Sequence, residues 1–149
     1  MSIEQTLRGA ADPDCALTMM LEHFACDGGT IHVIGDDGNL QLQAHSKGMP
    51  EPVLCAIRNI VPGKGMAGAA YARNDVVETC NLQEDDACGA AEPGARATGF
   101  GGSLALPIRK SDGEVIGAIG VATIRERIFT QAERDELLAC GEAIACLFS

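Results

Sequence analysis

The sequence has few aromatic residues and little positive charge. It has no Trp, one Tyr and four Phe, which leaves little surface for stacking nucleic-acid bases or a large flat cofactor. Eleven Lys and Arg are set against twenty-one Asp and Glu, and the net charge is −10. Nucleic acids and anionic membranes both attract basic patches. The composition therefore argues against both partners.

Long hydrophobic runs and a signal sequence are also lacking. The longest uncharged stretch of interest, Val115–Ile124, has 10 residues, whereas a membrane helix needs about 20. The first residues, MSIEQTLRGA, contain no basic region followed by an apolar core. A hydrophobic content of 46% is too high for a disordered chain. We therefore expect a soluble, cytoplasmic protein with a single domain over residues 1–149.

The cysteines lack the spacing of zinc or redox motifs. They are Cys15, Cys26, Cys55, Cys80, Cys88, Cys140 and Cys146. An odd number of cysteines without a secretory signal predicts no disulfide framework, and the lack of a C-x-x-C pair argues against a zinc ribbon or a thioredoxin-like site. We expect most of these thiols to be small buried apolar residues. We expect no metal and no cofactor. A thiolate or metal site at Cys80 and Cys88, with Glu78, Asp85 and Asp86 nearby, is the alternative.

Two helix starts are clear. Asp12-Pro13 joins a capping side chain to a residue suited to the first turn, and Asp27-Gly28-Gly29 ends that helix. Thr130–Glu133 has the pattern of a capping box at the start of the last helix. Apolar residues at helical spacing form one stripe over Ala16–Phe24 and another over Leu137–Phe148.

Two β-hairpins flank the middle of the chain. Strands Thr30–Ile34 and Leu40–Ser46 enclose an Asp- and Gly-rich turn, and alternation places Leu40, Leu42 and Ala44 on one face. Strands Ser103–Arg109 and Glu114–Ile124 form the second hairpin. Small and apolar residues on both faces of the last strand predict a central position in the sheet.

The middle of the chain is less regular. We expect a short helix over Pro52–Asn59, a strand stub at Ile60-Val61, a helix over Met66–Arg73 and a strand over Val76–Thr79. A long polar connection, Asn81–Gly101, follows. Connections of this length are uncommon in compact domains and are often functional.

This order of elements predicts an α+β fold with a central antiparallel sheet. Terminal helices pack on one face, and the irregular middle forms a lid of loop and short helices over a pocket on the other. This arrangement resembles the GAF domain over essentially the whole chain. The resemblance rests on Gly63–Gly68, Arg96–Ile108, Gly113–Gly120 and Phe129-Thr130.

The resemblance implies a small-molecule-binding sensory domain that acts on a separate signalling protein, a kinase or regulator. It also implies a homodimer through the terminal helices. The candidate ligand-binding residues are Gly65, Met66, Ala67, Gly68, Glu78, Cys80, Arg96, Thr98 and Ser103. Gly65–Gly68 open a helix whose free N–H groups suit a small anion, and the Arg96 guanidinium suits carboxylate, nitrate or phosphate. A polar metabolite is the other ligand class.

Other functions fit the sequence less well. The free methionine-(R)-sulfoxide reductases of the family carry Cys where this chain has Ala67, and their Ala-Cys-Asp segment is missing, so thiol catalysis is an alternative. The Gly63-x-Gly65-x-x-Gly68 pattern lacks the strand of a dinucleotide site. The Asn-Lys pair of cyclic-nucleotide binders is absent, and bilin attachment is disfavoured by the scarce aromatic residues. A ligand-free interaction module is the third hypothesis. We expect His32 to be a partly buried, satisfied histidine.

Overall fold

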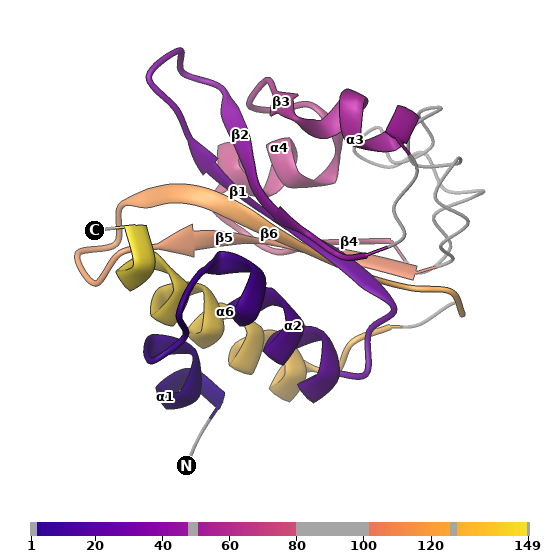
Figure 1. Ribbon diagram of the computed structural model, residues 1–149, viewed down its shortest axis with the longest axis vertical. Helices are drawn as coiled ribbons and strands as arrows, with labels where there is room; N and C mark the ends of the chain where they lie inside the picture. Colours follow the sequence, from indigo (N-terminus) through magenta and orange to yellow (C-terminus); the bar gives the residue numbers. More distant parts are fainter. Residues whose placement is uncertain (1–2, 48–50, 80–101, 126–127, 149) are drawn as a thin grey trace.

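The computed structural model describes residues 3–47, 51–79, 102–125 and 128–148 (Figure 1). The helices are α1 (Ile3–Arg8), α2 (Pro13–His23), α3 (Glu51–Ile57), α4 (Gly65–Arg73), α6 (Gln131–Ala145) and the 3-10 turn η2 (Cys146–Phe148). The strands are β1 (Gly28–Ile34), β2 (Leu40–His45), β3 (Asn59–Ile60), β4 (Val77–Thr79), β5 (Gly102–Arg109) and β6 (Val115–Thr123). Helix α1 has no counterpart in the sequence-based expectations.

The six strands form one antiparallel sheet in the order β3-β2-β1-β6-β5-β4. Strand β6 lies at its centre between β1 and β5, as its apolar composition predicts. Gly117 is needed there, because a Cβ would lie 2.1 Å from the His32 carbonyl oxygen on β1.

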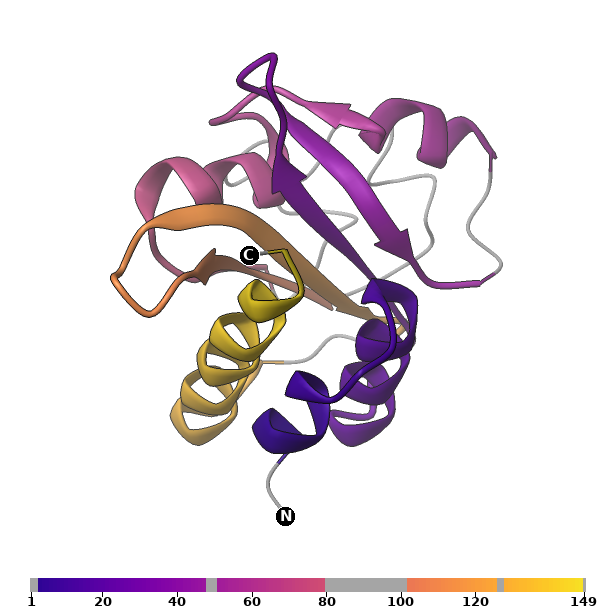
Figure 2. The same ribbon diagram turned by 60° about the vertical axis from the view of Figure 1, so that its left-hand side comes forward.

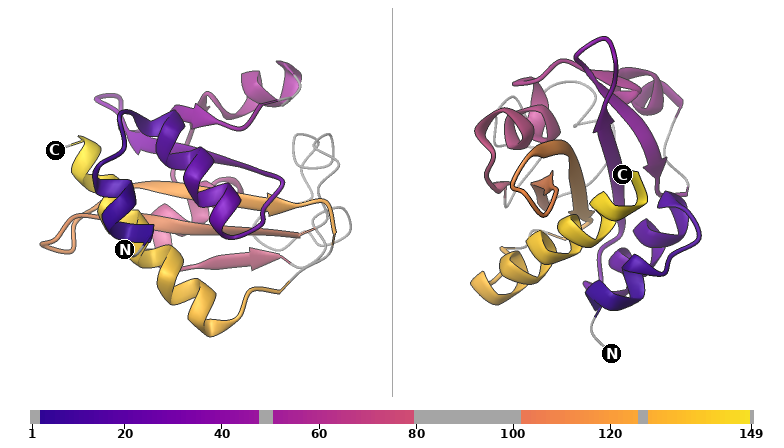
Figure 3. Two further views of the ribbon diagram at one scale, coloured as in Figure 1. Left: turned by 60° about the horizontal axis from the view of Figure 1, so that its bottom comes forward. Right: turned by 90° about the vertical axis from the view of Figure 1, so that its left-hand side faces the viewer.

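Helices cover both faces of the sheet. Helices α1, α2 and α6 lie on one face, and α3 and α4 lie on the other (Figures 1 and 3). Figure 2 shows α6 beside α1 and α2. We call the face covered by α1, α2 and α6 the helical face, and the face covered by α3 and α4 the α3/α4 face. The predicted α+β layering is confirmed for the described residues. None of the described helices is long and apolar enough to cross a membrane.

The predicted helix starts are confirmed. The Asp12 Oδ1 atom accepts a hydrogen bond of 2.8 Å from the Cys15 N–H. The Thr130 hydroxyl accepts from the Glu133 N–H, and the Glu133 carboxylate accepts from the Thr130 N–H. These bonds satisfy N–H groups that a helix start leaves without partners. Helix α2 ends earlier than expected, at His23, and β1 already begins at Gly28.

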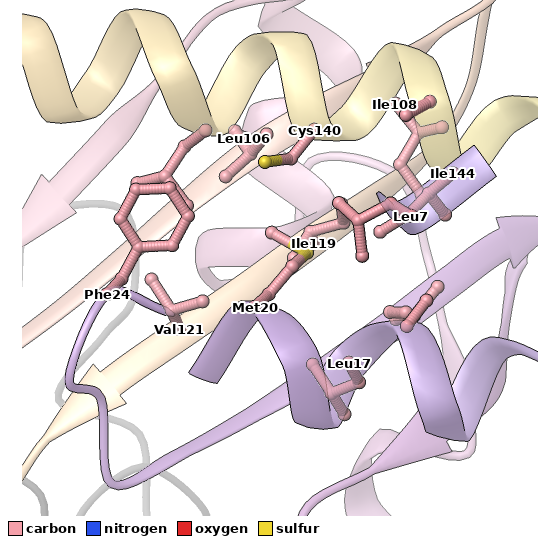
Figure 4. Close-up of a cluster of buried hydrophobic side chains, with 14 of the residues drawn as sticks. Leu7, Leu17, Met20, Phe24, Leu106, Ile108, Ile119, Val121, Cys140 and Ile144 are labelled. Carbon is pink, nitrogen blue, oxygen red and sulfur yellow. The ribbon is translucent and has the colours of Figure 1, made fainter. Parts of the chain in front are cut away.

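The main hydrophobic core lies between the helical face of the sheet and helices α1, α2 and α6. Its side chains come from α1, α2, α6, β1, β2, β5 and β6 (Figure 4). They include Leu7, Leu17, Met20, Phe24, Leu106, Ile108, Ile119, Val121, Cys140 and Ile144. Both predicted stripes point into this core, since Ala16, Met20, Leu137 and Ile144 are buried within the chain. Any dimer through these helices must therefore use their outer sides.

A β-bulge changes the predicted alternation of β2. Ala44 pairs with Ile31 and Leu42 pairs with His32, with a register shift between the two pairs. Because Ile31 and His32 lie on opposite faces, Leu42 and Ala44 do too. Ala44 joins the main core. The expectation that Leu40, Leu42 and Ala44 share one face is wrong for Ala44, because the extra residue of the bulge reverses the alternation.

The expectation that most cysteines are buried is wrong for the described ones. Cys140 is buried and Cys26 is partly exposed, whereas Cys15, Cys55 and Cys146 are exposed. None of these five described cysteines forms a disulfide. The exposed ones lie on the outer sides of short or terminal helical segments, where composition alone gives no indication of burial.

Candidate functional site

The two faces of the sheet carry side chains of different size and polarity. On β5, Leu104 and Leu106 belong to the main core. Because neighbouring side chains of a strand alternate between its faces, Ser103 and Ala105 point to the α3/α4 face. The same alternation on β6 and β1 places Ala118, Gly120, Thr30 and His32 on that face. Over β1, β5 and β6 the α3/α4 face is thus lined mainly by small and polar groups, with the larger Leu40 and Leu42 beside them on β2, whereas the helical face is filled by Leu, Ile and Met.

Helix α4 covers part of the α3/α4 face. Ala69 and Ala70 of α4 pack with Ala105 and Val77 in a small second core, against which Met66 also packs. These are small side chains, so α4 lies close to β5 and β6. The predicted site residues Gly65, Met66, Ala67, Gly68 and Ser103 are therefore on one side of the sheet.

The start of α4 owes its shape to glycine. Gly63 and Gly65 have φ values of +92° and +63°, which side chains with a Cβ rarely adopt. A Cβ on Gly68 would lie 2.8 Å from the Val61 carbonyl oxygen, so this glycine permits close packing between α4 and the segment after β3. The Lys64 side chain at the N-cap makes no capping bond. Helix α4 thus begins without a side-chain cap.

His32 lies under α3, and it differs from the sequence-based expectation. Its side chain is 1% exposed, so it is fully rather than partly buried. The Nε2 atom is 2.8 Å from the Ile57 carbonyl oxygen at the end of α3. A carbonyl only accepts hydrogen bonds, so Nε2 carries the proton and Nδ1 has a free lone pair in the neutral ring. Among the described residues, Nδ1 is the buried side-chain atom left without a hydrogen-bond partner.

Burial sets the charge of this imidazole. Desolvation lowers the pKa of His32 below its ordinary value of 6.5, and the hydrogen bond to Ile57 acts in the opposite direction. Its cross-strand neighbours, Leu42 and Ala118, bring no charge to it. At neutral pH His32 is therefore a neutral acceptor on the α3/α4 face.

Glu78 lies away from the other described candidates. Its position opposite Leu104 on β5 directs the side chain to the helical face. There one carboxylate oxygen pairs with the Arg134 guanidinium of α6, and the other accepts a 2.7 Å hydrogen bond from the Phe129 N–H. Both oxygens are engaged, and the side chain is only 10% exposed. This arrangement connects β4 to the start of α6.

The remaining candidates, Cys80, Arg96 and Thr98, lie outside the described residues. The same holds for Cys88, Asp85 and Asp86 of the alternative thiolate or metal site. In residues 3–47, 51–79, 102–125 and 128–148, no three His, Cys, Asp or Glu side chains gather as a metal site would require.

A cleft of about 660 Å³ lies on the helical side, between α2 and the end of β2 with the residues that follow it. Asp14 and Glu22 line it from α2, and His45 and Lys47 line it from the other side. Nothing in the sequence pattern indicates this cleft, because its walls come from segments about thirty residues apart.

Comparison with known proteins places these features in a family. The family model described as the GAF domain matches residues 14–146. A search of curated proteins by sequence found no match.

Solved structures share the fold. The GAF domain of the Acinetobacter phosphoenolpyruvate-protein phosphotransferase has a TM-score of 0.73 at 16% identity, over 98% of this chain and 88% of that one. The type II free methionine-R-sulfoxide reductase of Thermoplasma acidophilum has a TM-score of 0.71 at 18% identity, over 98% of this chain and 95% of that one. A domain of a two-component sensor histidine kinase protein of Sinorhizobium meliloti has a TM-score of 0.69 at 16% identity, over 89% of this chain and 83% of that one. Such low identities show the fold alone. Because the family match spans most of the sequence and the fold agrees with it, the chain belongs to the GAF domain family, a fold of sensory and regulatory proteins.

Proposed function

We propose that this protein is a sensory domain that binds a small polar molecule on the α3/α4 face of the sheet and signals to a separate protein. The observation that carries the proposal is the contrast between the two faces. Large aliphatic side chains fill the helical face, whereas on β1, β5 and β6 the other face is lined by Ser103, Ala105, Ala118, Gly120 and His32. Small side chains leave room that large ones would fill, and polar ones orient a ligand.

Two sets of groups on this face support a polar ligand. The start of α4, with Gly65, Met66 and Ala67 in its first turn, presents backbone N–H groups and the positive end of the helix dipole, which suit an anion. The Ser103 hydroxyl donates to the Val121 carbonyl at 3.3 Å, and its oxygen keeps lone pairs to accept from a ligand. A small anion and a polar metabolite are the two ligand classes.

The opposite face provides the route to a partner. Glu78 of β4 holds Arg134 and the Phe129 N–H at the start of α6, so a shift of the sheet edge reaches this helix directly. The Nε2 atom of His23 on α2 and the Oε1 atom of Glu136 on α6 are 2.8 Å apart, within hydrogen-bond distance at the surface. We place the partner, or a second copy of the chain, on the outer sides of α2 and α6.

A thermal-shift panel on the reduced protein tests the proposal. The compounds are nitrate, nitrite, phosphate, amino acids, methionine sulfoxide, cyclic nucleotides and zinc. A ligand at 100 times its Kd stabilises by about 2.7 kcal/mol, which raises Tm by roughly 5–10 °C for a domain of this size. A shift from one chemical class supports the sensor and identifies its ligand class.

Two other results would replace the proposal. Turnover of free methionine sulfoxide with NADPH and thioredoxin would make the protein a thiol enzyme. A flat panel would favour a ligand-free interaction module.

A matched pair of variants locates the binding face. Thr30→Val and Thr18→Val make the same change from hydroxyl to methyl. Thr30 lies on the α3/α4 face, where its Oγ1 is 3.3 Å from the position of a Cβ on Gly120, and Thr18 is exposed on α2. We expect Thr30→Val to reduce the shift given by the active panel compound and Thr18→Val to leave it unchanged. Equal effects would place the ligand elsewhere.

A further inference from the structure

We infer that His32 recognises a hydrogen-bond donor of the ligand through its Nδ1 atom, so that the ligand carries an N–H or O–H group at this point. The inference rests on the proposed function and gives the ligand a required chemical feature. The carrying observation is the buried Nδ1 atom, which has no partner among the described residues.

An unpaired buried acceptor is costly, because it loses its bonds to water and gains none in the protein. Most buried polar atoms in native proteins are paired for this reason. The strands around His32 cannot pair its Nδ1 atom, since Leu42 on β2 and Ala118 on β6 have apolar side chains. The His32 imidazole is therefore suited to accept a hydrogen bond at Nδ1 from a donor that comes from outside the sheet.

The orientation of the ring is fixed by α3. The 2.8 Å bond from Nε2 to the Ile57 carbonyl at the last residue of α3 holds the ring and keeps the proton on Nε2. This leaves Nδ1 as a preset acceptor. The arrangement costs little reorganisation when a donor arrives, which is the basis of selective recognition by fixed groups.

This chemistry discriminates among the panel compounds by whether they carry a hydrogen-bond donor. Nitrate and nitrite have only acceptor oxygens, so their contact with the Nδ1 lone pair would be repulsive. Amino acids, methionine sulfoxide and cyclic nucleotides carry N–H or O–H groups that can donate to it. We therefore expect the ligand to come from the donor-bearing compounds, even where an anionic group of the same molecule binds at the start of α4.

Two variants separate the nitrogens of His32. Asparagine carries its amide near the position of Nδ1 and keeps an acceptor there, whereas glutamine places its amide near Nε2 and keeps the bond to Ile57. With the donor-bearing compound that stabilises the wild type, His32→Gln is expected to weaken affinity about tenfold, the effect of one lost hydrogen bond to a group that stays buried. His32→Asn is expected to stay within about threefold of wild type.

Nitrogen NMR of the ¹⁵N-labelled wild-type protein tests the inference without any substitution. The free protein should show His32 with a proton on Nε2 and none on Nδ1, and the Nδ1 resonance should move when the stabilising compound is added. His23 and His45, the other two histidines, serve as internal references. A free protein with the proton on Nδ1 would overturn the inference even if neither variant folds.

The outcomes separate this inference from the proposed function. If no panel compound stabilises the wild type, the sensor function fails and the inference fails with it. If a compound stabilises wild type and His32→Gln equally, or if nitrate is the compound that binds, the sensor function stands and the role of His32 is refuted. Affinity about tenfold weaker in His32→Gln, together with near wild-type affinity in His32→Asn, supports both.

Discussion

Replacing Glu78 distinguishes a ligand-binding residue from one that joins the sheet to a helix. The sequence places Glu78 among the candidate ligand residues, whereas in the structure its carboxylate contacts Arg134 and the Phe129 N–H. If the structural contacts are its role, Glu78→Ala lowers the free energy of unfolding and leaves ligand affinity unchanged.

The contacts give the size of the effect. A hydrogen bond from a backbone N–H to a charged acceptor contributes about 1.5–3 kcal/mol. The Arg134 side chain is 33% exposed, so solvent screens the ion pair and its contribution is about 1 kcal/mol. Glu78→Ala should therefore lose about 2–4 kcal/mol. Glu78→Gln, which keeps an acceptor oxygen, should lose about half as much.

Urea unfolding followed by far-UV circular dichroism measures this loss, because the chain has no Trp for a fluorescence probe. With a slope of about 2 kcal/mol per molar urea, Glu78→Ala should lower the midpoint by about 1–2 M. Arg134→Met completes a double-mutant cycle, in which we expect a coupling free energy of about 1 kcal/mol. An unchanged midpoint combined with weaker ligand binding would refute this reasoning and return Glu78 to the ligand site.

Three further predictions follow from single features. Because burial holds the pKa of His32 below 6.5, the unfolded state takes up a proton at this side chain before the folded state does as pH falls. The contribution of His32 to the free energy of unfolding is therefore full above pH 6.5 and declines below it by up to about 1.4 kcal/mol per pH unit. Between pH 7.5 and pH 5.5 the urea midpoint should fall less in His32→Asn than in the wild type. Gly117→Ala should cost about 3 kcal/mol, because its Cβ would meet the β1 backbone at 2.1 Å; Gly9→Ala, with its nearest atom at 3.7 Å, is the control and should change the urea midpoint little. Sedimentation should show a homodimer, whose interface we expect on the outer sides of α2 and α6. A strict monomer at high concentration would exclude the dimer.

Signals that act over three or four residues were readable directly from the sequence. The Asp12 cap and the Thr130–Glu133 capping box form their bonds as predicted, because both partners are in the same helical turn. The composition of β6 predicted its central place, since a strand covered on both faces needs apolar or small residues on both. Together with the order of the elements, these signals were enough for the fold class.

The candidate site was predicted only in part. Gly65–Gly68 and Ser103 lie on the same side of the sheet, while Cys80, Arg96 and Thr98 lie outside the described residues. His32 was assigned as a satisfied histidine, because a sequence shows that a residue alternates inward but not how many of its ring nitrogens find partners.

The tertiary structure alone decided which side chains meet across the sheet. Glu78 reaches Phe129 and Arg134 because β4 pairs with β5 in a register that turns it toward α6. Ala44 enters the main core because a bulge shifts β2 by one residue. Both outcomes depend on pairing between segments far apart in the chain, and a one-residue shift of register moves a side chain to the opposite face. Apart from α1, the sequence by itself thus determined most of the described elements and their layers, and strand register determined which residues face α3 and α4.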